Sequence, residues 1–348
     1  MYIFSIFNVC NCMSCVLSGS IPDLGKKESR VPVLLVQNPG FHYSGCRRTI
    51  QQQSAGGAAL DFGSGWDIIL PSGWSMAFWI ALVYRGAKAV GLRELRSLAF
   101  EAGVLTFPDC CPDTPSGAEL SSSRADELRS VYNRRPPAKR CNYDKMGVMA
   151  PFHCPWLELV RGWMRRCEEV GNDQSFYCVR NRRLLQLLSD MCAGVAVHTP
   201  QTSFSAGLRH SGCAIVKVHI VMLGRGAPNP FALICLPTKE DIVSTTHRKK
   251  LTSNSVRAPT EPLHRKSSNT DASVLNAVLG SADRPTIGFV VEGGYSHATA
   301  KGSAVGFVSV LGLTKLLDEK QHPTNCTTVL VRCTQSLQYR PAVLHVVV

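Results

Sequence analysis

The chain has 348 residues, of which 45% are hydrophobic and 18% are charged. This length allows about two domains with substantial cores, and the composition excludes an intrinsically disordered protein. The formal net charge of +13 predicts a basic surface whose partner is a nucleic acid or an anionic membrane, although charge alone does not distinguish the two.

The first residues and the fifteen cysteines predict neither export nor a disulfide framework. Residues 1–17 are apolar but lack a basic start and contain polar interruptions, unlike a secretory signal. A metal-like spacing is found at Cys12 and Cys15, with Cys10 nearby, but no second pair of ligands follows at a suitable distance. No apolar run reaches the ~20 residues of a bilayer span. We expect a soluble chain with reduced, mostly buried thiols.

Two short strands are predicted in the first quarter of the chain. Val31–Gln37 is an apolar run that ends at an Asn-Pro-Gly turn signal, and Asp67–Leu70 follows the turn-forming Gly63 and Gly65. Apolar runs of this length between turn residues predict buried strands. Residues 41–62 are rich in Gly, Gln and Ala and predict a loop.

A helix is predicted directly after the second strand. Ser72 is its expected N-cap, apolar side chains repeat at four-residue spacing, and Gly86 suits the position just past its end. Arg85 either stabilises the helix dipole or, if exposed, contacts a phosphate. We expect four aromatic residues of this stretch to be core: Trp66, Trp74, Phe78 and Trp79.

Two further helices are predicted before residue 140. Leu92–Phe100 predicts the first, and residues 107–117 predict an irregular segment because they include four proline and glycine residues. Ser123–Asp126 has the spacing of a capping box and predicts the start of the second. That helix must end near Arg135, because the two prolines that follow cannot continue it.

The segment after this helix, RRPPAKR at residues 134–140, is the strongest functional candidate. It places four cations in seven residues: Arg134, Arg135, Lys139 and Arg140. The two prolines predict a stiff, extended backbone that holds the charges apart at low entropic cost, which suits contact with successive phosphates. The alternative is a solvated helix terminus whose arginines only complement the dipole, worth about 0.3 to 1 kcal/mol.

The second half of the chain is predicted to be rich in strands. Residues 180–188 predict a short amphipathic helix with a basic start. Alternating residues 216–221 predict a half-exposed strand, and five later runs predict further strands: 231–236, 286–291, 303–310, 328–333 and 343–348. Residues 244–284 predict a mobile basic loop, in which His247–Lys250 and His264–Lys266 either seek phosphates or are simply solvated.

A set of separated motifs follows one order along the chain: Gly65-Trp66-Asp67, Gly73-Trp74, Tyr84-Arg85-Gly86, RRPPAKR, Cys154-Pro155-Trp156, Ile234-Cys235-Leu236-Pro237, Gly293-Gly294-Tyr295-Ser296 and Ser336-Leu337-Gln338-Tyr339-Arg340. These motifs resemble the large Pop subunit family shared by eukaryotic ribonuclease P and ribonuclease MRP, whose signature region is the POPLD domain. The resemblance runs in order from about residue 31 to residue 348, with Pro341 as a local departure. The family's basic N-terminal half has no counterpart, so we expect a C-terminal portion or an incomplete gene model.

The resemblance implies an α+β fold. It predicts a helix-containing POPLD region and a mostly antiparallel β C-terminal region, which is distantly similar to the glycine-cleavage aminomethyltransferase fold. The expected divisions are an unmatched tail at 1–30, the POPLD region at 31–160, a linker with a short helix at 161–210, and a β-rich domain at 211–348 that carries the basic loop 244–284.

The resemblance also implies a non-catalytic, RNA-binding scaffold of ribonuclease P and ribonuclease MRP, which act in tRNA 5′-end maturation and rRNA processing in the nucleus and nucleolus. Chemistry would belong to the RNA and its metal ions, so no catalytic residue, cofactor or metal is expected in the chain. The expected partners are the two RNAs and other protein subunits, and no membrane. The expected RNA contacts are Arg134, Arg135, Lys139 and Arg140, with Arg85 and Arg340 in second rank.

Two other functions remain open at this point. A folate-binding, aminomethyltransferase-like enzyme would need an acidic residue poised over the folate, and no motif in the sequence places one. A protein–protein interaction module without RNA contacts would keep the aromatic core and tolerate loss of the basic run.

Overall fold

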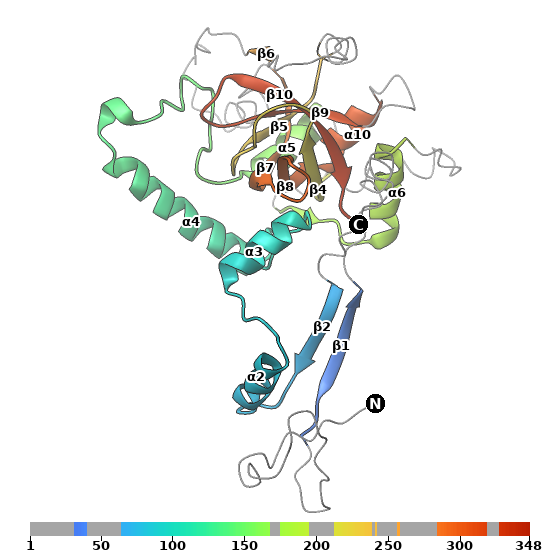
Figure 1. Ribbon diagram of the computed structural model, residues 1–348. Helices are drawn as coiled ribbons and strands as arrows, with labels where there is room; N and C mark the ends of the chain where they lie inside the picture. Colours follow the sequence, from blue (N-terminus) through green and yellow to red (C-terminus); the bar gives the residue numbers. More distant parts are fainter. Residues whose placement is uncertain are drawn as a thin grey trace, which may run out of the picture. The chain divides into compact units, whose positions relative to one another are not determined.

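The computed structural model describes residues 31–39, 64–167, 175–194, 212–238, 241, 256–257, 284–318 and 327–348. The described residues up to Leu98 form one compact unit, and those from Ala99 to Val348 form a second (Figure 1). The expected tail at 1–30, the cysteines at 10–15 and nearly all of the basic loop 244–284 lie outside the described residues.

The first unit is an antiparallel strand pair followed by a helix. Strand β1 (Leu34–Pro39) pairs with β2 (Ser64–Ile69), and α2 spans Ser75–Tyr84. The two predicted strands and the helix are confirmed, as is Gly86, whose φ of +93° suits the position after a helix. The predicted cap at Ser72 is wrong: the N-cap is Trp74, whose side chain does not cap the helix.

The expected aromatic core of this unit is largely wrong. Phe78 is buried at 8% exposure, but Trp66 is 59% exposed, Trp79 is 50% exposed and Trp74 is half-buried. Strands β1 and β2 are likewise exposed where buried strands were predicted. Two strands, a ten-residue helix and the first residues of the next helix, 92–98, are too few elements to enclose a core of their own. The apolar side chains therefore stay on the surface.

The second unit is built around a closed antiparallel barrel. Six strands follow one another in the order β4, β8, β7, β5, β9 and β10, and β10 pairs back with β4. Their bounds are β4 Ala214–Met222, β5 Leu233–Cys235, β7 Thr286–Ser296, β8 Lys301–Ser309, β9 Thr328–Arg332 and β10 Gln338–Val346. Two short strands extend the sheet: β3 (Tyr177–Cys178) beside β4 and β6 (Val256–Arg257) beside β10.

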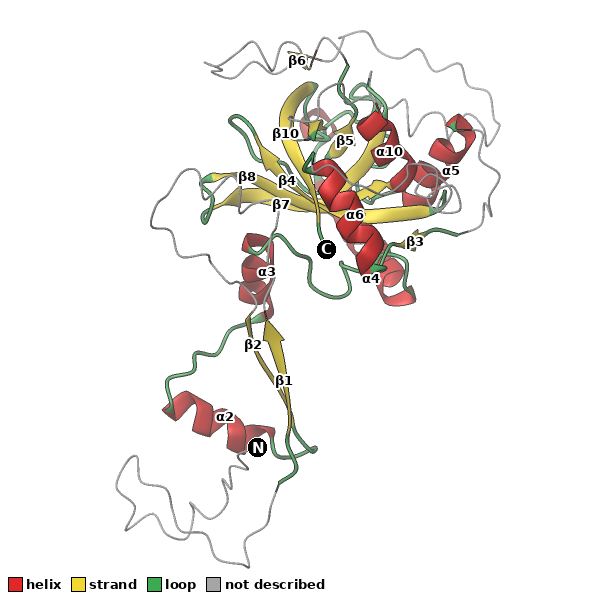
Figure 2. Ribbon diagram, turned by 90° about the vertical axis from the view of Figure 1, so that its right-hand side faces the viewer, coloured by secondary structure: helices red, strands yellow, loops and turns green. Residues whose placement is uncertain are grey.

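Helices pack on the barrel and bury its outer positions. Helix α5 (Trp156–Arg166) contacts β7 and β8, α6 (Arg182–Cys192) contacts β10, and α10 (Val310–Asp318) contacts β4, β7 and β8 (Figure 2). The fully buried Trp163 of α5 donates its indole Nε1–H to the carbonyl oxygen of Thr286 at 2.9 Å. One continuous apolar core joins these helices to the strands.

The α+β class with a mostly antiparallel C-terminal region is confirmed. Helix α3 (Leu92–Glu101) and α6 are found where helices were predicted, whereas α5 and α10 were not predicted. The predicted half-exposed strand is instead the mostly buried β4, because it pairs on both sides and α10 packs on it. Among the described residues, no helix is long and apolar enough to cross a membrane.

Candidate nucleic-acid interface

The predicted basic run follows a long helix of the second unit. Helix α4 spans Pro115–Arg134, eight residues longer at its start than the capping-box spacing predicted. Its N-cap is Thr114, whose Oγ1 accepts a hydrogen bond from the Gly117 amide at 3.2 Å, with Pro115 at the first helical position. The prediction of an irregular segment at 107–117 is therefore wrong for its last three residues, which are helical. The helix ends before the two prolines, as predicted.

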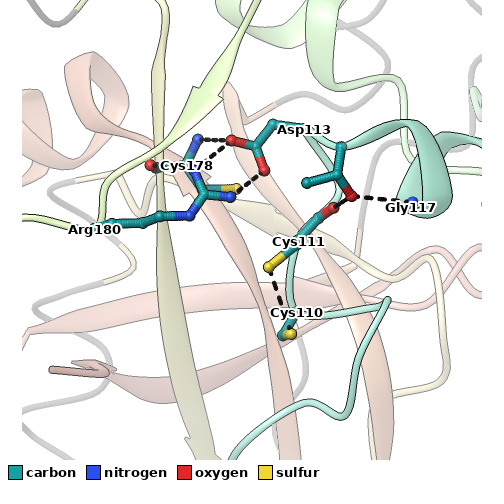
Figure 3. Close-up of polar contacts among 7 residues, drawn as sticks. Cys110, Cys111, Asp113, Gly117, Cys178 and Arg180 are labelled. Carbon is teal, nitrogen blue, oxygen red and sulfur yellow. Dashed lines mark hydrogen bonds and ion pairs between the residues drawn. The ribbon is translucent and has the colours of Figure 1, made fainter.

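The start of α4 is tied to the barrel sheet by Asp113 (Figure 3). Its carboxylate accepts hydrogen bonds from Arg180 Nη2 at 2.6 Å, from Arg180 Nη1 at 2.7 Å and from the backbone amide of Cys178 in β3 at 2.9 Å. Burial alone would raise the pKa of Asp113, but these hydrogen bonds outweigh burial and lower the pKa to about 2. The carboxylate is thus a charged anchor at neutral pH.

A second ion pair joins the segment before α4 to the middle of the helix, and two neighbouring thiols lie in the same segment. Arg124 of α4 donates to both carboxylate oxygens of Asp109, at 3.1 and 3.2 Å. The sulfur atoms of Cys110 and Cys111 lie 3.6 Å apart (Figure 3). Of the ten cysteines that the structure describes, Cys167 is the exposed one.

The end of α4 is held by three aromatic rings. Tyr132 of α4, Tyr143 and Phe152 pack against one another with ring centroids 5.4 to 5.6 Å apart. The Tyr132 hydroxyl also donates to the carbonyl oxygen of Cys141 at 2.8 Å. Aromatic pairs of this kind contribute about 0.5 to 1.5 kcal/mol each beyond their buried area. They fix the segment that follows the basic run against the last turns of the helix.

Arg140 closes the basic run back onto the helix end. Its Nε donates to the carbonyl oxygen of Arg135 at 2.7 Å, and its Nη2 donates to that of Asn133 at 2.5 Å. Its guanidinium lies over the ring of Tyr132. The last carbonyls of a helix lack partners within the helix and carry partial negative charge, so a cation there satisfies and stabilises them.

Beyond the run, the chain returns to the barrel (Figure 1). The buried Arg332 of β9 donates from Nη1 to the carbonyl oxygen of Met146 at 2.8 Å, and Val148 joins the barrel core. The basic run therefore lies between two fixed points, the anchored helix α4 on one side and the barrel on the other.

Three of the four predicted cations are exposed. Arg134 is the last residue of α4 and donates from Nη2 to the Ser130 hydroxyl at 3.1 Å, Arg135 is the C-cap, and Lys139 ends a short 3-10 helix, η1 (Pro137–Lys139). No described carboxylate forms an ion pair with these three side chains. The predicted extended backbone holds for Arg135 and Pro136, with ψ near 142° and 143°, but is wrong for the turn of η1.

The two second-rank residues lie in different units. Arg85 is the exposed C-cap of α2 in the first unit, and its backbone amide bonds the carbonyl oxygens of Ala81 and Leu82. Arg340 lies on β10 in the second unit, where its Nη1 donates to the carbonyl oxygen of Arg225 and its guanidinium covers the Cα of Gly226. Arg340 thus holds the loop at Arg225 and Gly226, and this contact uses one of its guanidinium nitrogens.

A histidine–serine pair in the barrel was not predicted. His219 Nε2 lies 2.7 Å from Ser303 Oγ, and burial lowers the pKa of His219 to about 3, which keeps the ring neutral. Both side chains are buried, so neither offers a face to a substrate. The described residues include no cluster of three or more His, Cys, Asp or Glu side chains with the geometry of a metal site.

The chain matches two protein families and several curated proteins. Residues 65–156 match the POPLD (NUC188) domain, and residues 214–276 and 268–348 match the POP1 C-terminal domain.

The ribonucleases P/MRP protein subunit POP1 of Homo sapiens is 30% identical over 93% of this chain and 43% of its own length. The subunit popl-1 of Caenorhabditis elegans is 26% identical over 75% of this chain and 30% of its own length. The subunit POP1 of Arabidopsis thaliana is 40% identical over 32% of this chain and 13% of its own length. The chain spans less than half the length of these curated relatives.

Proposed function

The chain belongs to the POP1 family of ribonuclease P/MRP protein subunits, and from this premise we propose that it is a non-catalytic, RNA-binding scaffold subunit of these two ribonucleases. In this role it supports tRNA 5′-end maturation and rRNA processing, while the chemistry belongs to the RNA and its metal ions. Its partners are the RNAs of the two enzymes and their other protein subunits, in the nucleus and nucleolus.

The observation that carries the proposal is the fixed and exposed basic run. Arg134, Arg135 and Lys139 stand on backbone that is held by α4, by Arg140 and by the aromatic rings of Tyr132 and its neighbours. Because the backbone that carries these cations is already ordered, binding costs little backbone entropy, so more of the attraction to phosphates is kept. An RNA backbone offers successive phosphates to such an array.

The exposed apolar side chains of the first unit favour the same assembly. Trp66, Met76, Trp79 and Tyr84 are each at least half exposed. Exposed apolar groups gathered on one small unit are typical of protein contact surfaces. We expect other protein subunits of the two ribonucleases to contact this unit, while the basic run of the second unit contacts RNA.

The RNAs that crosslink to the chain in cells test the proposal. Cells that express the tagged chain are irradiated with ultraviolet light, the chain is purified under denaturing conditions, and the attached RNA is sequenced. We expect enrichment of the ribonuclease P and MRP RNAs over an untagged control. A library that matches the control, or one dominated by unrelated RNAs, contradicts the proposal.

A further inference from the structure

The turn between β7 and β8 is held in one shape by a carboxylate. Glu101, at the end of α3, accepts hydrogen bonds from the Ser296 hydroxyl at 2.6 Å and from the amides of His297 and Ala298 at 2.9 and 3.2 Å. The Thr299 amide closes the turn by donating to Ser296 Oγ at 3.2 Å. Burial alone would raise the pKa of Glu101, but these hydrogen bonds outweigh it and lower the pKa, so the anchor is charged at neutral pH.

This ordered turn presents two rings to solvent. Tyr295 is 53% exposed and His297 is exposed, and their rings meet edge to face with centroids 5.5 Å apart and planes at 81°. The barrel core contains neither ring. An exposed tyrosine on a rigid turn, steadied by a second ring at its edge, has the form of a stacking platform.

Two exposed cationic residues, Lys301 and Arg225, lie beside the same turn. Lys301 is the exposed first residue of β8 and pairs with Ser296 across the hairpin. The next pair, Gly302 with Tyr295, lies against the loop after β4: a Cβ at Gly302 would come within 2.1 Å of the Gly226 carbonyl oxygen. The exposed Arg225 precedes Gly226 in that loop.

Arg340 holds the cationic loop in place. It bonds the Arg225 carbonyl oxygen, and a Cβ at Gly226 would come within 2.7 Å of Arg340 Nη1. Gly226 has a φ of +109°, a left-handed backbone conformation that favours glycine. Only glycine leaves room for the guanidinium here, so the loop and the arginine fit together as one structure. They lie beside the hairpin formed by β7 and β8, two strands that Figure 2 labels.

We propose that this hairpin surface, formed by Tyr295, His297, Lys301 and Arg225, binds an unpaired RNA nucleotide. Tyr295 stacks on the base, Lys301 and Arg225 pair with the flanking phosphates, and Arg340 acts as a positioning residue for Arg225. The proposal rests on the RNA-binding function proposed above and adds to it a second contact, one that reads single strands. Bases inside a duplex have both faces covered, so a stacking platform selects unpaired bases.

The charges around the hairpin surface favour an RNA strand as its ligand. The carboxylate of Glu101 is occupied by the backbone of the turn, while the guanidinium and ammonium groups of Arg225 and Lys301 are exposed. An anionic strand whose bases stack is complementary to a surface that combines cations with rings.

The test compares two single strands with the same charge. One is a fluorescent 12-nucleotide oligouridine, and the other is the same backbone with abasic sites throughout. Tyr295→Ala is expected to weaken binding of the uridine strand about tenfold, within the range of one base–aromatic stack, and to leave the abasic strand unaffected. Tyr295→Trp keeps a ring and is expected to retain affinity, whereas Tyr295→Leu is expected to lose it as Tyr295→Ala does.

The cations give a second, independent readout. Lys301→Gln and Arg225→Gln are each expected to reduce the salt dependence of binding by about 0.7 log units per log unit for both strands, whereas Tyr295→Ala leaves that slope unchanged. Equal affinities of wild type, Tyr295→Ala and Tyr295→Leu for the uridine strand overturn this inference while leaving the proposed function intact. A wild-type chain that binds neither strand contradicts the proposed function as well.

Discussion

The guanidinium carbon of Arg140 lies 5.7 Å from the centre of the Tyr132 ring, and its nitrogens bond two carbonyl oxygens at the end of α4. These contacts distinguish Arg140 from the other three cations of the same seven-residue segment, Arg134, Arg135 and Lys139. Arg140 organises the segment, and the other three cations are exposed on it.

Arg140→Lys is expected to behave like Arg140→Gln, although it keeps the charge. Lysine lacks the planar fork that bonds two carbonyls and covers a ring, so the end of α4 loosens and the chain loses about 1 kcal/mol of stability. Hydrogen exchange at the Arg135 amide should speed up, and RNA affinity should fall in both variants. Arg135→Lys is the control, because a phosphate contact tolerates lysine. Wild-type exchange and affinity in Arg140→Lys would show that only its charge matters.

The pair of Asp113 and Arg180 is expected to make stability depend on acid pH. The pKa of Asp113 is lowered to about 2, below the unfolded value of about 3.9. The pair therefore contributes stability above about pH 4, and the contribution is lost as the pH falls through 2. Solvent screening at Arg180, which is 54% exposed, limits it to roughly 1 to 2 kcal/mol.

Urea unfolding of Asp113→Asn between pH 5 and pH 2 tests this expectation. The variant should be less stable at pH 5 and should show a flatter pH dependence than wild type. Asp126→Asn is the control, since Asp126 is 69% exposed and pairs with the exposed Arg129, and exposed pairs contribute less than about 1 kcal/mol. Parallel pH curves for wild type and Asp113→Asn would contradict the anchoring role.

Two tryptophans are expected to differ sharply in their contribution to folding. Trp163→Phe leaves the buried carbonyl oxygen of Thr286 without its indole donor and opens space in the core, so about 2 to 3 kcal/mol of stability should be lost. Trp79→Phe changes a half-exposed side chain and should cost less than about 0.5 kcal/mol. Denaturant unfolding of the two variants checks the difference, and equal losses would contradict the assignment of the core to the second unit.

Gly306→Ala is expected to disrupt the barrel. A Cβ at this position would lie 2.2 Å from the carbonyl oxygen of Phe289 on the neighbouring strand, so β7 and β8 must move apart. Overpacking of this kind costs about 1 to 3 kcal/mol. Gly224→Ala is the control, because a Cβ there has no atom within 4 Å. The melting temperature should fall in the first variant only, and a stable Gly306→Ala would contradict the close strand contact.

The sequence predicted best what a few neighbouring residues determine. Pro136 and Pro137 end α4 because their chemistry forbids its continuation, and Gly86 follows α2 because it adopts a positive φ. The apolar runs that form β4, β7 and β8 were also correctly predicted to be strands. Each of these features depends on local backbone preference.

What the sequence could not show depends on residues far apart in the chain. Asp113 meets Arg180 across 67 residues, and Glu101 meets Ser296 across 195, with no local pattern that joins either pair. Trp79 was assigned to a core because it is apolar, but burial depends on how many elements surround a side chain. The positioning role of Arg140 was hidden for a similar reason, since its charge in the sequence equals that of its neighbours.

The central claim is that the exposed cations of the basic run bind RNA phosphates. The decisive variant replaces Arg134, Arg135 and Lys139 with glutamine. A control variant of equal charge replaces three exposed cations elsewhere in the chain: Arg93, Arg129 and Lys315.

Affinity for ribonuclease P RNA, measured for both variants and wild type from 50 to 400 mM salt, tests this claim most directly. Each lost phosphate contact lowers the slope of log affinity against log salt by about 0.7 to 0.9, so the run variant should lose about 2 units of slope. The control should lose less than 1. A run variant whose slope equals that of wild type would contradict the account.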